Sequence, residues 1–322
     1  MTRGRMRLPR ITLAAMALAL VAHAARTGAA VADAAMADAA VADAAEADAV
    51  LGILEDVPGK YAGEGNRRAV RVVFEHAGGR WRAFPNDCRD ARCLQEAVGQ
   101  YPAGMDWTVA LQGRVLGRLA GVRAEASLFT SDIGIEEIAD QASVPAVGDR
   151  SEEWAGFGPV PLYRPLVAVS PPRAADPDGW RPAEPSPALV RSFKTEFRKN
   201  FPELCTWDAD ETLSPCAYRD ADIRTGPSVA SGRGWTLVQL RLENAADCAS
   251  DIPISGFAAW FVADTGGNIR CLGQWMRLLD AGDYDGDGVS ELVFQISGYN
   301  LGGYTLFYDD FRGRADFRFA YH

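Results

Sequence analysis

The sequence predicts a mostly β fold, either β-propeller-like or a β-sandwich, with one or two short helices. The patterns of four aromatic-rich segments each predict two strands joined by a glycine-containing turn. Helix-forming patterns are few, and an acidic loop near the C-terminus runs directly into an apolar, β-rich segment. With 48% of its 322 residues hydrophobic, the chain can bury a sizeable core.

Residues 1–24 are predicted to form a cleaved signal peptide. Four arginines, at positions 3, 5, 7 and 10, precede an apolar run over residues 11–22, and Ala22-His23-Ala24 offers a cleavage site of the A-x-A type. This run is too short to span a bilayer, which needs about 20 residues. We therefore expect no transmembrane segment in the mature chain, and a periplasmic or secreted location.

The charge and the arginine content limit the partners and suggest the source. Arginine outnumbers lysine by 30 to 3, a skew typical of GC-rich bacterial genomes. Loss of the four N-terminal arginines would change the formal charge from −10 to −14. A net negative chain without clustered basic residues is a poor candidate for binding nucleic acid or an anionic membrane surface. The expected partner is an unknown protein or glycan.

Residues 25–56 are expected to form a flexible, Ala/Asp-rich spacer of low complexity. Within them, residues 31–50 repeat a five-residue unit four times, as VADAA, MADAA, VADAA and EADAV. A period of five matches neither 3.6 nor 3.5, so a helix here would carry no sustained apolar face.

Residues 57–158 are expected to form an N-terminal β-rich lobe. Hairpins are predicted over residues 70–84, around Gly78-Gly79, and over residues 107–119, around Gln112-Gly113. A short helix is predicted from Asp90 to Val98. The following residues, 159–187, hold nine of the 18 prolines and are expected to form an irregular connection that marks a lobe boundary, although a functional loop is an alternative. Within them, Leu166–Val169 resembles a strand.

Residues 188–322 are expected to form a C-terminal β-rich lobe. A helix should begin at Ser186-Pro187, because Ser is a favoured N-cap and Pro suits the first turn, and it should end at Phe201-Pro202. Residues 235–242 read as a strand. Hairpins are predicted over residues 257–272 and 304–321.

The chain has six cysteines, an even number that favours disulfides in an oxidising compartment. Sequence cannot choose among the possible pairings, and we predict nearest-neighbour pairing: Cys88–Cys93, Cys205–Cys216 and Cys248–Cys271. A zinc site is disfavoured, because no C-x-x-C pair occurs and only His76 and His322 follow the predicted cleavage site.

The most informative stretch is the acidic loop GDYDGDGVSELVF. Counted from Asp283, carboxylates fall at positions 1, 3, 5 and 9, which are Asp283, Asp285, Asp287 and Glu291. Calcium takes 6 to 8 oxygen ligands, and a glycine such as Gly288 permits the sharp turn that wraps the ion. We therefore predict a structural calcium site made of Asp283, Asp285, Asp287, the carbonyl of Val289, and Glu291. An acidic turn without an ion is the alternative.

The loop is not an EF-hand, because an EF-hand needs a bidentate Glu at position 12, where this chain has Phe294. The pattern of acidic loop, apolar strand, glycine-containing turn (SGYNLGG) and second strand (YTLFYDD) resembles an FG-GAP/VCBS repeat, the calcium-binding blade of integrin-type β-propellers. The resemblance covers about residues 273–310 as a single copy. It implies a β-propeller-like unit in which the carboxylates of the loop hold calcium. Three further Asp-x-Asp pairs, at 176–178, 208–210 and 220–222, are explained by turn chemistry.

Catalytic patterns are absent from the sequence. His76 is the one internal histidine after the predicted cleavage site, where a solvated strand end is expected. The acid pairs Glu136-Glu137 and Glu152-Glu153 would point to opposite faces of a strand. The tryptophans are expected mainly in the core. We therefore predict an exported, calcium-stabilised binding or interaction module, with a hydrolase acting on envelope glycan or peptide as the alternative.

Overall fold

The computed structural model of the chain has two units, Met1–Glu46 and Ala47–His322. It describes residues 48–57, 65–86, 88, 90–102, 104–122, 124, 133–138, 143–155, 161–207, 213–216, 218–243, 257–298 and 301–320. These all lie in the second unit. The predicted signal peptide and most of the predicted spacer lie outside the described residues.

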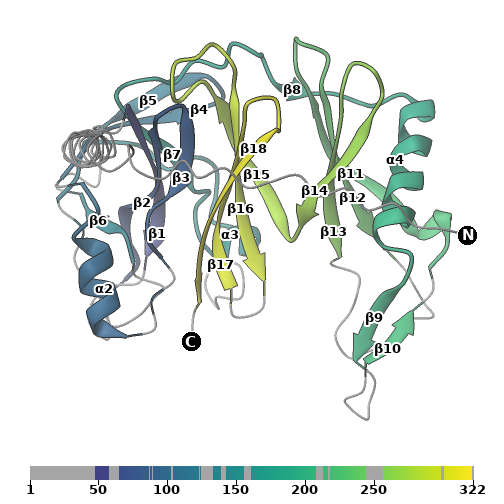
Figure 1. The fold of residues 1–322 in the computed structure, drawn as a ribbon, viewed down its shortest axis with the longest axis horizontal. Coiled ribbons are helices and arrows are strands. Elements are labelled where there is room, and N and C mark those ends of the chain that lie inside the picture. The colour runs from purple at the N-terminus through teal and green to yellow at the C-terminus, as the bar shows by residue number, and fades with distance from the viewer. Residues whose placement is uncertain are drawn as a thin grey trace, which may run out of the picture. The chain divides into compact units, whose positions relative to one another are not determined.

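The prediction of a mostly β fold is confirmed. The described strands form three large antiparallel sheets, of seven, five and four strands, and a separate two-stranded hairpin (Figure 1). In this part of the chain the sheets are open, none closes into a barrel, and they pack face to face as in a β-sandwich. None of the described helices is long and apolar enough to cross a membrane.

The seven-stranded sheet has the order β3-β2-β1-β7-β4-β5, with β6 paired to β2. Its strands are β1 (Ala49–Val57), β2 (Arg67–Ala77), β3 (Arg80–Ala83), β4 (Asp106–Leu111), β5 (Arg114–Ala120), β6 (Ile135–Glu137) and β7 (Leu166–Ser170). Both hairpins predicted in the N-terminal lobe are present, as β2–β3 and β4–β5. The predicted strand at Leu166–Val169 is present as β7.

Two expected boundaries are corrected by this sheet. β1 begins at Ala49, inside the expected spacer 25–56, because its apolar residues pair with β2 on one side and β7 on the other. Leu51, Ile53 and Leu54 are almost fully buried there. The expected connection 159–187 contributes β7 to the middle of the same sheet, so part of it is regular structure.

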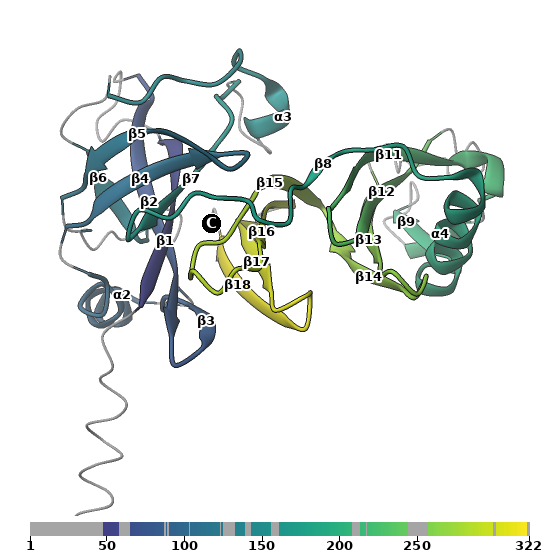
Figure 2. The ribbon, with the colours of Figure 1, turned by 90° about the horizontal axis from the view of Figure 1, so that it is seen from above.

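The five-stranded sheet has the order β14-β13-β12-β11-β8. Its strands are β8 (Arg181–Pro182), β11 (Ile223–Ala230), β12 (Thr236–Leu242), β13 (Ala258–Ala263) and β14 (Ile269–Gln274). One face is covered by α4 (Pro187–Asn200) (Figure 1 and Figure 2). Phe193 and Phe197 of this helix are fully buried. Ser186 caps α4 as predicted, since its hydroxyl accepts the backbone N–H of Leu189 at 3.2 Å.

The four-stranded sheet has the order β15-β16-β17-β18, an up-and-down meander of β15 (Met276–Gly282), β16 (Glu291–Gly298), β17 (Leu301–Tyr308) and β18 (Gly313–Ala320). Successive side chains of β16 pack into different hydrophobic cores. Val293 packs with the seven-stranded sheet, whereas Leu292 and Phe294 pack with the five-stranded sheet. Because both faces of this sheet are buried, its strands carry continuous apolar runs.

The four-stranded sheet therefore joins the two others into one packed structure. Within the expected C-terminal lobe 188–322, α4 and the five-stranded sheet enclose a core of their own, whereas residues of the last four strands also pack into the core of the N-terminal sheet. The Tyr304 hydroxyl also donates to the Glu55 carboxylate, and Arg71 Nε donates to Glu55 at 2.7 Å, linking β17 to β1 and β2.

The remaining elements are short. They are α2 (Ala91–Val98), α3 (Glu152–Ala155), the 3₁₀ turn η2 (Asp220–Asp222), and the hairpin β9 (Leu204–Trp207) with β10 (Leu213–Cys216). The predicted disulfide Cys88–Cys93 is present and ties the start of α2 to the segment after β3. The side chains of Cys205 and Cys216 lie outside the described residues, so their pairing stays a prediction. Cys271 of β14 is a free, half-buried thiol in the structure, so the predicted Cys248–Cys271 disulfide is not formed there.

A substitution at Gly303 would test how closely β17 and β18 approach each other. A Cβ there would lie 2.1 Å from the backbone oxygen of Phe317, and its φ of +154° also disfavours a side chain. We expect Gly303→Ala to lower the free energy of unfolding by about 3 kcal/mol, measured by urea denaturation. Gly298→Ala is the matched control, because the nearest atom to a Cβ there is Leu301 Cβ at 4.0 Å. Equal losses in the two variants would contradict the packing described.

Glu136 tests the pH dependence of stability. Its side chain is fully buried in β6 and accepts the indole N–H of Trp107 at 2.8 Å, and burial raises the pKa of its carboxyl to about 7. The folded state thus binds this proton more tightly than the unfolded state does. The contribution of Glu136 to the free energy of unfolding is therefore present at low pH and is lost as pH rises through about 7. Glu136→Gln should therefore stabilise the protein increasingly between pH 5 and pH 8, measured by denaturation.

Glu137→Gln is the control for this pH series. The Glu137 side chain is on the opposite face and lies 2.5 Å from Arg67 Nη1, with 35% of its surface exposed. This variant should not show the rise with pH. A pH-independent effect of Glu136→Gln would contradict the assignment of a buried, protonated carboxyl.

Candidate metal centre

The acidic loop connects β15 to β16, the two strands that begin the four-stranded sheet. Side chains alternate along it, since Tyr284 is fully buried whereas Asp283 and Asp285 are partly exposed and Asp287 is exposed. The Tyr284 ring packs in the core that the four-stranded and seven-stranded sheets share, and it thereby anchors the loop to that core. Strands on both sides of the loop agree with the exclusion of an EF-hand.

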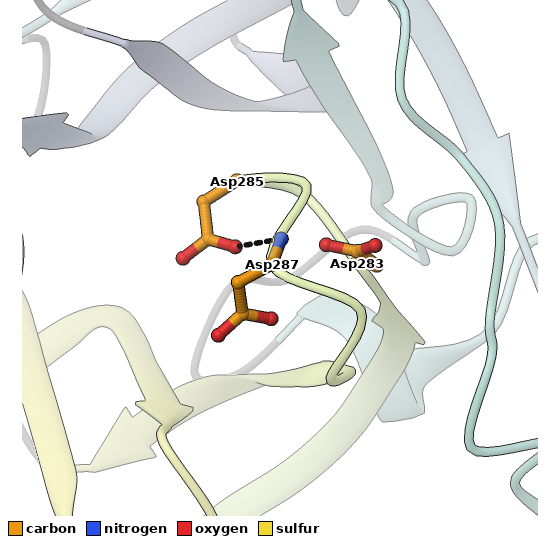
Figure 3. A group of neighbouring side chains, drawn as sticks. All are labelled: Asp283, Asp285 and Asp287. Atoms are coloured by element: carbon orange, nitrogen blue, oxygen red, sulfur yellow. Dashed lines mark hydrogen bonds between the residues drawn. The ribbon is translucent and has the colours of Figure 1, made fainter. Parts of the chain in front are cut away.

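Backbone N–H groups of the loop orient its aspartates. Asp283 accepts from Gly286 at 2.7 Å and from Gly288 at 3.1 Å. Asp285 accepts from the backbone of Asp287 at 3.1 Å (dashed in Figure 3), and Asp287 accepts from that of Val289 at 2.7 Å. Such side-chain-to-backbone bonds define successive Asx turns, so the backbone of the loop itself orients each of the three carboxylates.

Two glycines make this winding possible. Gly286 and Gly288 have φ of +87° and +88°, in the left-handed region that favours glycine. The predicted turn at Gly288 is thus present in the structure. At Gly286 a Cβ would also lie 2.9 Å from the guanidinium carbon of Arg173, so a larger residue would displace that arginine.

The three aspartates come close enough to share one ion. One oxygen from each of Asp283, Asp285 and Asp287 lies within 4.8 Å of the others (Figure 3). Calcium binds oxygen at about 2.3–2.6 Å, so two of its ligands lie at most about 5.2 Å apart. The donor set is all oxygen and rich in carboxylates, which fits calcium better than zinc or copper.

Glu291 is placed differently from the aspartates. It begins β16, is almost fully buried, and lies outside the group of three oxygens. Its Oε2 accepts the backbone N–H of Tyr284 at 2.7 Å, which closes the base of the loop. Burial first, and then the charges of Asp285, Asp287 and Asp283, raise the pKa of Glu291 to about 9. A nearby cation would relieve this repulsion.

Two basic side chains near the loop were missed by sequence reasoning. His76 of β2 is not a solvated strand end as expected. Its side chain is only 13% exposed, and its Nε2 lies 3.4 Å from Asp285 Oδ2. Arg173 donates to the backbone carbonyl of Asp285. It belongs to the segment after β7, which comprises residues 171–180. Both lie far from the loop in sequence, and no local pattern marks them.

The segment after β7 clamps the loop from the other side. The backbone N–H of Asp283 donates to the Ala175 carbonyl at 2.7 Å. The buried Ser290 hydroxyl donates to Asp176 at 2.7 Å and accepts the backbone N–H of Asp178 at 3.3 Å. Asp176 also accepts N–H groups of Gly179 and Trp180, which is the turn chemistry expected for this Asp-x-Asp pair.

The acid pairs considered for hydrolysis do not converge. Glu136 is buried in β6 while Glu137 faces Arg67, as expected for neighbours in a strand. Glu153 lies in α3, with its Oε1 3.6 Å from Arg277 Nε. Of the seven tryptophans whose side chains the structure describes, four are buried as expected: Trp81, Trp107, Trp180 and Trp260. Trp154 and Trp235 are partly exposed, and Trp275 is 47% exposed.

Comparisons with known proteins do not add a family. No family model matches the chain, and comparisons with curated proteins and with solved structures give no match.

Ser290 tests the clamp between the loop and the segment after β7. Ser290→Ala leaves Asp176 and the Asp178 N–H without their hydroxyl partner in a buried site, so we expect a loss of about 1–3 kcal/mol in the free energy of unfolding. Ser192→Ala removes an exposed hydroxyl on α4 that donates to Ala188, and should change stability by less than about 0.5 kcal/mol. Denaturant titration of both variants checks this, and equal losses would contradict the clamp.

Proposed function

We propose that this chain is an exported binding or interaction module whose fold is stabilised by one calcium ion in the loop 283–291. The observation that carries the proposal is the convergence of the Asp283, Asp285 and Asp287 oxygens within 4.8 Å. These three carboxylates, the Val289 carbonyl and Glu291 would hold the ion. When bound, calcium would supply positive charge that offsets the repulsion among the four acids.

The resemblance to an FG-GAP/VCBS repeat supports this proposal. The loop lies between β15 and β16, followed by β17 and β18 in one antiparallel meander. Four-stranded antiparallel sheets are the blades of β-propellers. A single blade with its calcium loop, packed between two other sheets, is the arrangement that we propose for residues 273–310.

A structural role for the ion follows from what the loop contacts. Tyr284 anchors it in the core, His76 reaches it from β2, and Ala175 accepts the backbone N–H of Asp283. An ordered loop would thus hold three separate parts of the chain in register. A catalytic metal needs a neighbouring acid or base beside an open ligand position. The two basic side chains described beside this loop, His76 and Arg173, both contact Asp285.

Export is proposed from two features. Residues 1–24 have the basic, apolar and small-residue regions of a signal peptide. The Cys88–Cys93 disulfide fits an oxidising compartment such as the periplasm or the cell exterior. The partner that we propose is a protein or a glycan in that compartment.

Calcium titration tests the proposed role of the loop. We expect calcium to raise the melting temperature of the protein, with a gain of about 2.7 kcal/mol at 100 times the dissociation constant. Asp287→Asn should abolish this shift, because it removes one of the three converging carboxylates. Differential scanning calorimetry with calcium, with magnesium, and with a chelator gives the measurement.

Asp264→Asn is the matched control. Asp264 also makes an Asx turn, accepting from Gly266 at 2.8 Å and Asn268 at 2.9 Å, but it lies at the β13–β14 turn, away from the acidic loop. This variant should keep the full calcium shift. The proposal fails if wild-type protein shows no shift, or if Asp287→Asn keeps it.

A further inference from the structure

A cavity of about 200 Å³ lies where the three sheets meet, apart from the proposed calcium loop. Its walls come from α3, from the segments on either side of β7, and from β11, β12, β13 and β15. The side chains that define it are three tryptophans and three arginines: Trp154, Trp180, Trp260, Arg164, Arg241 and Arg277.

Two of the arginines are held against one aromatic ring. The guanidinium carbons of Arg164 and Arg277 lie 5.5 Å and 5.9 Å from the centre of the Trp154 ring. Cation–π contacts of this kind fix a planar guanidinium at a wall. Arg164 is further anchored because its Nη2 donates to the Leu279 carbonyl of β15.

The same arginines carry buried donors that lack acceptors. Arg164 Nε and Arg277 Nη1 are buried, and neither donates to any residue that the structure describes. The indole N–H of Trp180, which lines the same cavity, is likewise buried and donates to no residue that the structure describes. Buried N–H groups in native proteins are normally hydrogen-bonded. Since guanidinium and indole nitrogens only donate, the partner that fits them is an acceptor.

The acids around the cavity do not occupy these donors. Asp280 accepts the backbone N–H of Gln112 at 2.8 Å and the Tyr284 hydroxyl at 3.3 Å. Asp176 accepts from the turn that follows it and from Ser290. Glu153 Oε1 lies 3.6 Å from Arg277 Nε, with a side chain 54% exposed to solvent. Burial lowers the pKa of both Arg164 and Arg277, while the charge of Glu153 opposes this shift at both residues and that of Asp280 opposes it at Arg164.

We propose that this cavity binds the carboxylate of a molecule about the size of one ring, such as an acidic sugar unit. Arg164 and Arg277 would hold the carboxylate, because a guanidinium presents parallel donors that match its two oxygens. Trp180 and Trp260 would form the apolar walls for the body of the ligand. This inference rests on the binding role proposed above and names the ligand class for it.

The test is binding of small carboxylates to the calcium-loaded, full mature chain. Glucuronate and benzoate carry the same carboxylate on a sugar ring and on a flat aromatic ring, and glucose is the neutral analogue. We expect saturable quenching of tryptophan fluorescence by at least one of the two acids, with the tighter one identifying the body of the ligand. Glucose should not bind measurably.

Arginine variants locate the site. Arg277→Met should weaken binding of the acid by about tenfold or more, as expected for loss of a charged hydrogen bond. Arg277→Lys keeps the positive charge but lacks the planar guanidinium, so it should weaken binding of the acid less than Arg277→Met does. The lysine variant provides the test if the methionine variant does not fold. Arg318→Met is the control, since Arg318 Nη2 lies 3.8 Å from Asp316 on β18, with the side chain 48% exposed.

The calcium-induced rise in melting temperature is recorded for every variant as a separate readout. A variant that keeps this rise but loses the acid supports the cavity as the binding site. The cavity proposal is overturned if neither acid binds to wild-type protein that shows the rise. It is also overturned if glucose binds as tightly, or if the Arg277 variants bind the acid as wild type does. Absence of the rise itself counts against the calcium proposal alone.

Discussion

The close placement of Asp283, Asp285 and Asp287 above the buried Tyr284 is the constraint on which much of this fold depends. Their mutual repulsion must be offset, because like charges a few ångströms apart are unfavourable in a partly buried site. The loop meets this need partly through its own backbone N–H groups and partly through His76 and Arg173. His76 and Arg173 come from different parts of the chain, so the acidic loop contacts segments that are distant in sequence.

The segment after β7 links the two proposed sites. On one side, Ala175 and Asp176 contact the backbone of Asp283 and the hydroxyl of Ser290. On the other side, Asp176 and Trp180 line the arginine-rich cavity. An ion that orders the loop would therefore also hold one wall of the cavity. This connection gives a physical reason why a binding module would depend on calcium, although the ion itself would not contact the ligand.

Local patterns in the sequence predicted most of the hairpins and both longer helices, because glycine turns and N-caps act over a few residues. The acidic loop was likewise recognisable from its spacing. The sequence did not reveal β1, whose apolar run follows an alanine-rich repeat, nor that β7 completes the first sheet. Contacts such as His76 with Asp285, or Arg277 with Trp154, join residues far apart in the chain, and only the packing of the sheets brings them together.

Terbium luminescence tests the central claim most directly. Terbium replaces calcium in oxygen-rich sites and emits strongly when a nearby tyrosine or tryptophan is excited, and Tyr284 lies within the loop itself. We expect sensitised emission that saturates at about one terbium per chain and is lost when calcium displaces the terbium. Emission that is absent, or that calcium does not displace, would contradict a calcium site in this loop.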